Sequence, residues 1–383
     1  MNRPPAARWW RRLFGVWIIG STALLLLPLG SPAAIRRQTP TTGADLMTVT
    51  AGAQYGGGAV DRFLLGGRYR RLWTVPVTVP VLHLARYDGG LRPTGAGGGM
   101  QTHTLHLASR AGRSFDFRSV DKVLTPVLPR FLERSAVGSI VQSQVAAGHP
   151  AAVLMAVPLQ AAAGLAHAQP TLVVLPDDTL LGPFRAGYAG VVGVLQEVPS
   201  GVLGTAEMLA RLDGSRTHRA DAHAFLTARL LDLFLNDWDR HEGQWRWAAQ
   251  NEGADTVWRP IPVDRDQAFS SYEGLLTSIV RVAVPKLPRF DRDPDVPSLT
   301  INSARLDRRL LGKLSRGDWD STAAWLVLRL DDSTIDSAVR RMPLEWWRLS
   351  GPALAATLRQ RRNHLPEAAE RFRSAILAAR APP

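Results

Sequence analysis

The sequence contains no cysteine among its 383 residues. This absence excludes disulfide bonds, thiolate metal sites, cysteine nucleophiles and lipidation at an N-terminal cysteine. Lysine is almost as scarce, because only Lys122, Lys286 and Lys313 contribute to the 46 basic residues, so the formal net charge of +13 comes from arginine. These arginines are scattered rather than gathered into one tract, and no docking motif accompanies them. We therefore expect no nucleic-acid partner.

The N-terminal region loses its charge after the first dozen residues. Arg8, Arg11 and Arg12 precede an uncharged stretch, residues 13–30, and small residues follow it. This layout is typical of a bacterial secretory signal, and the stretch is also close to the length that spans a bilayer. We therefore expect residues 1–34 to be a signal peptide or a membrane anchor. The protein is expected to be periplasmic or secreted, with membrane association through this segment if it is not cleaved.

The rest of the chain changes character near residue 199. Residues 35–60 are rich in Thr, Gly and Ala, which predicts a linker. Short β-rich stretches at 72–84, 104–108 and 114–122 predict an antiparallel sheet, and a helical pattern covers 126–167. Beyond residue 199, helices are expected over 221–235 and near 320–330, 333–341 and 351–378. The predicted fold class is α+β with two lobes, a β-rich lobe over 61–198 and a mainly helical lobe over 199–383.

The densest polar cluster lies at residues 236–247 and is followed by a second acidic segment at 260–269. Phosphoryl transfer needs a carboxylate near the acceptor hydroxyl, an amide or carboxylate oxygen on a metal ion, and a second carboxylate between metal and phosphate. Asp239 and Gln244 have the separation of the catalytic Asp and the metal-binding Asn in a kinase catalytic loop. Asp264 follows three apolar residues, which would place it at a strand end facing the same cleft.

Residues 239–244, Asp-Arg-His-Glu-Gly-Gln, resemble the D-R-H-x-x-N loop of phosphatidylinositol kinases and secretory-pathway kinases. Residues 264–269 resemble the D-x-D-x-x-F segment of CotH-type spore-coat kinases. The resemblance covers about residues 230–270 and implies a protein-kinase-like fold that uses ATP with Mg²⁺ or Mn²⁺. It implies that the catalytic residues are Asp239, Arg240 and His241. It also implies that the metal ligands are Gln244, Asp264 and Asp266.

The same resemblance extends into the first lobe. Gly97, Gly98 and Gly99 resemble a phosphate-covering loop, and residues 115–118 resemble the strand that carries the phosphate-binding lysine. Arg118 stands where that lysine is expected, with Lys122 as the alternative cation. Residues 194–197, ending at Glu197, resemble the hinge that contacts the adenine. The glutamate that a regulatory helix would supply is not identifiable, although Glu133 is available.

Three functions are compatible with these residues. The first is an exported ATP- and metal-dependent kinase that phosphorylates a hydroxyl of a protein or small molecule. The second is an inactive pseudokinase that serves as an envelope binding protein, because Arg118 replaces a lysine, Gln244 replaces an asparagine, and no glycine follows Asp264. The third is a metal-dependent phosphohydrolase, and its site would be built from Asp237, Asp239, His241 and Asp264.

Overall fold

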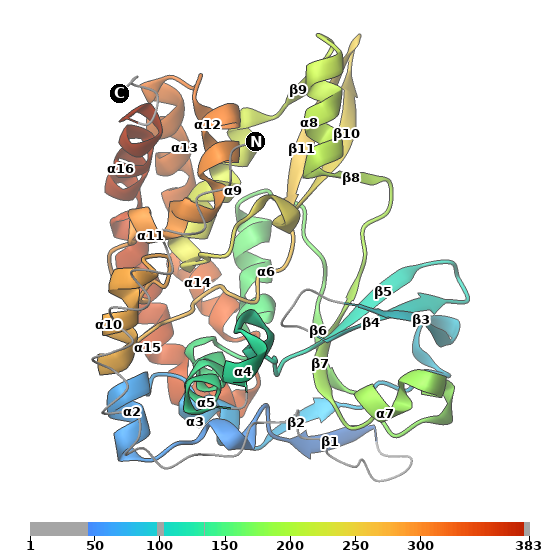
Figure 1. The fold of residues 1–383 in the computed structure, drawn as a ribbon. Coiled ribbons are helices and arrows are strands. Elements are labelled where there is room, and N and C mark those ends of the chain that lie inside the picture. Colours follow the sequence, from blue (N-terminus) through green and yellow to red (C-terminus); the bar gives the residue numbers. More distant parts are fainter. Residues whose placement is uncertain (1–44, 98–102, 134, 379–383) are drawn as a thin grey trace.

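The computed structural model describes residues 45–97, 103–133 and 135–378. The expected signal or anchor, residues 1–34, therefore lies outside the described residues, as do Gly98 and Gly99. A five-stranded antiparallel sheet dominates the lower right of Figure 1. Its order is β3-β4-β5-β7-β6, and the strands are Leu91–Gly97 (β3), Thr104–Ser109 (β4), Ser114–Ser119 (β5), Thr171–Val174 (β6) and Val192–Glu197 (β7).

Alternation along β4 and β5 gives this sheet two different faces. Leu105, Leu107, Phe115 and Phe117 are buried in a core of the sheet's own. The 3-10 helix η5 (Thr179–Phe184) and α7 (Arg185–Tyr188) contribute to that core. Arg118 falls on the opposite face because side chains alternate along a strand. The residues between Ser109 and Ser114 form the turn that joins β4 to β5.

A second, two-stranded sheet pairs β1 (Leu46–Val49) with β2 (Val77–Pro80). The linker expected over residues 35–60 is therefore wrong for its described part, because Val49 and Tyr55 are buried in the main core. The segment also contains η1 (Ala53–Tyr55) and the start of α2 (Ala59–Leu65). Strands were expected over 72–84, but residues 70–74 form the helix α3 (Arg70–Thr74). This helix stops just before Pro76, because the residue that precedes a proline is restricted to extended conformations. A further 3-10 turn, η2 (Tyr87–Gly89), precedes β3.

The helical stretch predicted over 126–167 is divided into several helices, with a break near His149-Pro150. It comprises η3 (Thr125–Val127), α4 (Arg130–Glu133), α5 (Ala136–Ser143), η4 (Gln144–Ala147) and α6 (Ala152–Ala162). Although α6 lies between two strands of the first lobe in sequence, it packs against α9 (Ala222–Leu235) and α14 (Asp332–Val339). Within the described residues no single helix has the length and apolarity to cross a bilayer, and only the bent pair 136–147 and 152–162 passes by length and composition.

The second lobe contains a four-stranded sheet that the sequence analysis missed. Its order is β8-β10-β11-β9, with strands Val202–Gly204 (β8), His218–Ala220 (β9), Trp245–Glu252 (β10) and Asp255–Pro262 (β11). Trp245 and Trp247 alternate with exposed or partly exposed neighbours along β10 and pack on Phe225 of α9. The helices α8 (Thr205–Gly214) and α9 precede the hairpin, and η6 (Glu242–Gln244) leads into it.

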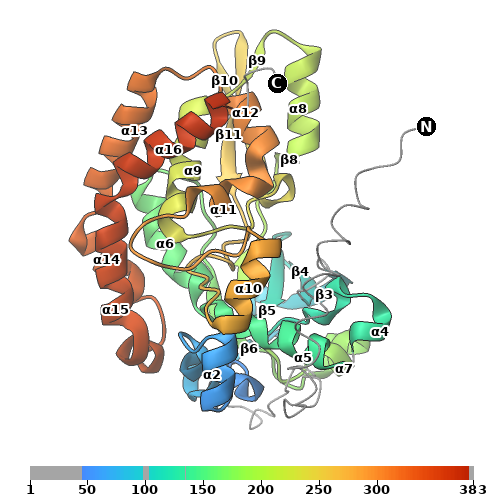
Figure 2. The ribbon, with the colours of Figure 1, turned by 60° about the vertical axis from the view of Figure 1, so that its left-hand side comes forward.

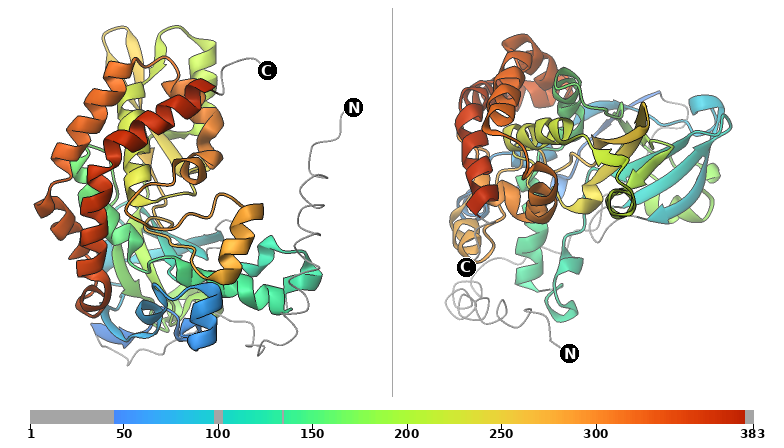
Figure 3. Two further views of the ribbon diagram at one scale, coloured as in Figure 1. Left: turned by 90° about the vertical axis from the view of Figure 1, so that its left-hand side faces the viewer. Right: turned by 90° about the horizontal axis from the view of Figure 1, so that it is seen from above.

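Helices complete the chain and surround α9 (Figures 2 and 3). They are α10 (Leu275–Ala283), α11 (Val296–Thr300), η7 (Ile301–Ser303), α12 (Ala304–Leu311), α13 (Arg316–Arg329), α14, α15 (Leu344–Asn363) and α16 (Leu365–Ala378). The predicted fold class is confirmed: the larger sheet lies in the N-terminal half and most helices in the C-terminal half. The third strand of the larger sheet carries Arg118.

Candidate functional site

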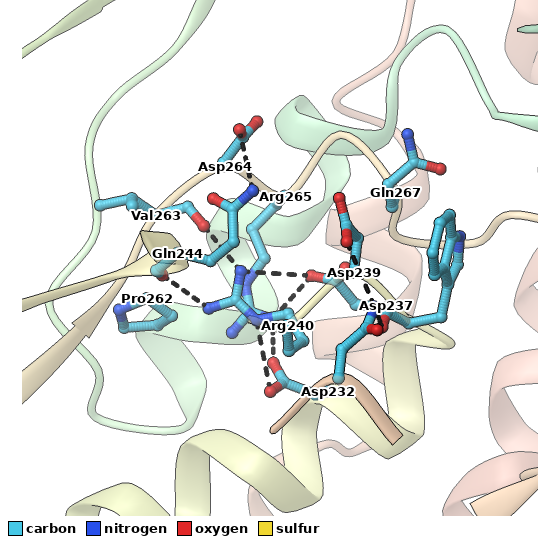
Figure 4. A network of polar contacts seen from close by, with 12 residues as sticks. Asp232, Asp237, Asp239, Arg240, Gln244, Pro262, Val263, Asp264, Arg265 and Gln267 are labelled. Carbon is cyan, nitrogen blue, oxygen red and sulfur yellow. Dashed lines mark hydrogen bonds and ion pairs between the residues drawn. The ribbon is translucent and has the colours of Figure 1, made fainter. Parts of the chain in front are cut away.

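A buried network of ion pairs lies beneath the candidate site (Figure 4). Three arginines and three aspartates balance one another within it: Arg229, Arg240, Arg265, Asp232, Asp237 and Asp307. All six are at most 3% exposed. Burial alone would raise the pKa of the Asp232 carboxyl, but the neighbouring arginines outweigh burial and hold that pKa below its ordinary value. The arginines therefore keep Asp232 ionised in the interior, whereas burial outweighs them at Asp237 and Asp307 and raises the pKa of both carboxyls.

Arg240 connects this network to the two segments that carry the predicted site. Its Nη1 donates to the carbonyl oxygen of Val263 at 2.7 Å, and its Nη2 donates to that of Gln244 at 3.0 Å. The guanidinium also lies over the ring of Trp245, 4.6 Å from the centroid. Arg240 was expected to be catalytic, but full burial leaves it no access to a substrate. Its role is to hold the loop 239–244 beside the end of β11.

His241 is also not placed as a catalytic residue. Its side chain is exposed, and its Nδ1 accepts a hydrogen bond from the backbone N–H of Gly243 at 3.1 Å. This contact caps the 3-10 helix η6. The ring therefore stabilises the local turn, as the short spacing between His241 and Gly243 favours.

Asp264 lies just after β11, in the left-handed backbone region with φ of +58°. The side-chain Nε2 of Gln244 donates to Asp264 Oδ2 at 3.2 Å. From the other lobe, Arg118 Nη1 lies 2.6 Å from Asp264 Oδ1. Burial alone would raise the pKa of the Asp264 carboxyl, but Arg118 and Lys122 outweigh burial and keep that pKa below its ordinary value.

A second ion pair joins the lobes next to the first. Lys122 Nζ lies 2.5 Å from Asp266 Oδ2, and the lysine side chain is only 12% exposed. Burial, and then repulsion by Asp264, raise the pKa of the Asp266 carboxyl to about 6. We call Arg118, Lys122, Asp264 and Asp266 the lobe clamp, because two cations of one lobe meet two carboxylates of the other.

The backbone of Lys122 is fixed by groups that the sequence analysis did not single out. Its N–H donates to Asp121 Oδ1 at 2.8 Å, and Gln142 Nε2 of α5 donates to its carbonyl oxygen at 2.6 Å. Tyr55 Oη donates to the Asp121 carboxylate at 2.5 Å. Burial raises the pKa of Asp121 to about 6. Glu133 lies on the short helix α4, and Lys122 pairs with Asp266 of the other lobe rather than with a helix carboxylate.

Asp239 extends from the same loop as Gln244, on the side away from the buried network (Figure 4). Its Oδ1 accepts a hydrogen bond from Asn302 Nδ2 at 3.3 Å. The pKa of Tyr272 is raised, first by burial and then by the charges of Asp239 and Asp266, so both carboxylates lie near this phenol. Asp239 is partly exposed, which leaves it accessible to a substrate hydroxyl.

A cavity of about 370 Å³ adjoins the lobe clamp. Arg118, Lys122, Asp264 and Asp266 form its polar end. The remaining wall is mostly apolar and includes Trp73, Val120, Leu124, Ile140, Val145, Val194, Trp238, Leu276, Val280 and Val284. This combination of an apolar wall with a few convergent charged groups is typical of a small-molecule site.

Two predicted nucleotide contacts lie elsewhere. Glu197 borders a second cavity, of about 670 Å³, and its carboxylate lies 3.5 Å from Arg113. Residues 193–195 of β7 are paired with strands on both sides, and Val194 and Gln196 line the cavity beside the lobe clamp. Gly97 ends β3 opposite Thr104, directly before the loop that was predicted to cover phosphates.

The predicted metal ligands fit a magnesium ion only in part. No group of three or more His, Asp or Glu residues is arranged to hold a metal within the described part of the chain. Mg²⁺, however, commonly uses one or two carboxylates and completes its shell with water and phosphate. Asp264 Oδ1 is buried and lies 2.6 Å from Arg118 Nη1, so a metal ion at this oxygen would compete with that guanidinium. Turning the Gln244 amide over would present its oxygen instead of its nitrogen to the same place.

No family model matches this sequence, and no curated protein matches it. Among solved structures, the chain is similar to CtkA, a proinflammatory kinase of Helicobacter pylori, with 12% identity and a TM-score of 0.37 over 73% of this chain and 95% of that one. It is also similar to WaaP in complex with acyl carrier protein, with 12% identity and a TM-score of 0.28 over 71% of this chain and 89% of that one. At these scores the likeness carries no inference about activity.

Proposed function

We propose that this protein is a kinase-like phosphotransferase that moves the terminal phosphate of ATP to a hydroxyl of a protein or small-molecule acceptor. The observation that carries the proposal is the lobe clamp, in which Arg118 meets Asp264 and Lys122 meets Asp266 beside Gln244. Cations from one lobe and carboxylates from the other are the groups that bind a nucleotide phosphate together with its metal ion.

Each side chain then has a distinct task. Asp239 would accept the proton of the acceptor hydroxyl as the hydroxyl oxygen bonds to phosphorus and the bond to the leaving nucleotide diphosphate breaks. Oxygens of Gln244, Asp264 and Asp266 would hold Mg²⁺ or Mn²⁺, which neutralises phosphate charge when bound. Arg118 and Lys122 would exchange their carboxylate partners for phosphate oxygens.

Binding and transfer should respond differently to two substitutions. Asp264→Asn removes a negative metal ligand, so we expect at least tenfold weaker binding of a fluorescent ATP analogue in the presence of Mg²⁺. Asp239→Asn keeps the ligands and should bind nucleotide normally, while phosphate transfer from labelled ATP falls by about 10²–10⁴-fold. Asp320→Asn, on the exposed surface of α13, is the matched control.

The kinase proposal is wrong if the full-length protein binds no nucleotide with either metal, or if both variants bind and act like wild type. Binding without transfer to any hydroxyl acceptor would instead support the pseudokinase. One observation favours that second function: both clamp carboxylates already have a cation partner in the structure.

The phosphohydrolase site predicted from the sequence does not form. Asp237 is buried in ion pairs with Arg265 and Arg240, and His241 faces the turn at Gly243. These residues therefore do not join Asp239 and Asp264 around one ion. Export remains part of the proposal, and N-terminal sequencing of the protein recovered outside the cytoplasm would test whether residues 1–34 are removed.

A further inference from the structure

The helix α10 has an apolar face that is wider than the cavity behind it. Leu276 and Val280 line the cavity next to the lobe clamp, although Val280 is also 42% exposed. Beside them on the same face, Leu275, Ile279 and Val282 are 50%, 46% and 86% exposed. A surface helix of a soluble domain normally turns its apolar face to the core. The exposed part of this face therefore indicates a binding surface.

A neighbouring helix also exposes apolar side chains. On α2, Val60 and Phe63 are 59% and 67% exposed. The two helices lie side by side at the surface (Figures 2 and 3). Their contact is close, because a Cβ atom on Gly274 would lie 2.4 Å from the backbone nitrogen of Gly66. We call these five exposed side chains the apolar ridge: Val60, Phe63, Leu275, Ile279 and Val282.

Unpaired positive charge borders the apolar ridge. Arg62 of α2 is exposed and bonds only to the carbonyl oxygen of Gly58, at 3.3 Å. Arg289 is exposed and contacts Ser278 of α10 at 3.5 Å. Within the described residues neither guanidinium pairs with a carboxylate, and the whole chain carries a net charge of +13. Apolar side chains flanked by arginine are the pattern that binds an anionic lipid surface.

We propose that the apolar ridge docks on a bilayer containing anionic lipid, and that the cavity behind α10 takes the hydrocarbon part of a membrane amphiphile. The cavity has the matching polarity, since its wall is apolar and its charged groups are gathered at the lobe clamp. The polar head of the amphiphile would lie at the clamp, which makes its hydroxyl the acceptor. This last point rests on the proposed function, whereas the docking does not.

Photolabelling of the full-length protein tests this proposal. The probe is a vesicle of phosphatidylglycerol carrying a photoactivatable acyl chain, without nucleotide or divalent metal. We expect adducts at residues 60–63 and 275–284, and on cavity residues such as Trp238. Ile279→Glu combined with Val282→Glu should lower labelling of these segments at least tenfold, while Leu328→Glu, at a 76% exposed position of α13, should leave it unchanged. Phosphatidylcholine vesicles should give several-fold fewer adducts.

A further variant separates the two halves of the proposal. Leu276→Trp fills the cavity and should remove the cavity adducts while the ridge adducts persist. Adducts confined to residues 1–44, or equal labelling of the wild type and the ridge variant, would overturn the docking. Loss of a dimer in the ridge variant, with lipid labelling unchanged, would assign the ridge to a second copy and also overturn it. Nucleotide binding is measured separately, so failure of the kinase proposal leaves these outcomes readable.

Discussion

Removal of one charge from the buried network should be costly. Asp232 receives Arg229 Nη1 at 2.5 Å, contacts Arg265, and lies 3.4 Å from Arg240 Nε. Asp232→Asn keeps the shape of the side chain but leaves three arginines facing two aspartates in a dry interior. Breaking a buried pair by removing one partner typically costs about 3–5 kcal/mol. That is a large share of the roughly 5–15 kcal/mol by which domains are stable.

The double variant Asp232→Leu with Arg265→Met provides the critical comparison. It removes one charge of each sign, so Arg229 and Arg240 remain balanced by Asp237 and Asp307. Replacement of a complete buried pair by apolar residues is often neutral or stabilising. We therefore expect the double variant to be more stable than Asp232→Asn, although it changes more atoms.

Thermal unfolding followed by circular dichroism measures both effects. For a unit the size of the helical lobe, each 1 kcal/mol shifts Tm by about 2–4 °C, so Asp232→Asn should lower Tm by roughly 6–20 °C. The surface variant Asp320→Asn should cost at most about 1 kcal/mol, because its pair with Arg316 is exposed. A shift of less than about 2 °C for Asp232→Asn would show that the network is hydrated and that burial does not set its energetics.

Two further predictions concern pH and backbone conformation. Burial and Asp264 raise the pKa of Asp266 to about 6, so the folded protein holds this proton more tightly than the unfolded chain does. The difference in stability between wild type and Asp266→Asn should therefore fall as pH rises from about 4 to 6 in denaturant titrations. A difference that stays constant with pH would contradict this prediction. Gly274 has φ of +99° and abuts Gly66, so Gly274→Ala should lower the stability by about 1–3 kcal/mol or more. Gly201 has φ of +68° but open space around it, so Gly201→Ala should cost less. Equal losses in Tm for the two variants would refute the close contact at Gly274.

Local patterns were sufficient to predict part of the fold. The alternation over 104–108 and 114–122 predicted β4 and β5, and the apolar face of residues 221–235 predicted α9. The hairpin of β10 and β11 was not predicted, because the many polar residues in 236–247 obscure the alternation of a strand. Trp245-Arg246-Trp247 alternates at the period of a strand, and Gly253 supplies the turn with φ of +63°. That alternation was the signal that could have found the hairpin.

The site was predictable in composition and not in pairing. Asp264, Gln244 and the two cations come together as expected, because spacing along a loop and the end of a strand limit where these side chains lie. Arg240 shows a limit of predicting roles from motif spacing. A residue at this position of the motif can contact a substrate when it is exposed, but it can only stabilise the fold when it is buried. Which of the two applies depends on Asp232 of α9, whose role only the tertiary structure shows. The support of Lys122 is likewise non-local, because Tyr55 donates to Asp121 across 66 residues of sequence and Gln142 donates to Tyr55 across 87.

The position of α6 determines how the two halves of the chain depend on each other. Met155 and Leu159 of this helix are completely buried in the core shared with α9. Leu172 of β6 and Val194 of β7 lie in that same core, whereas the other face of the five-stranded sheet has a core of its own with η5 and α7. The junction near residue 199 therefore divides the sequence without dividing the hydrophobic core.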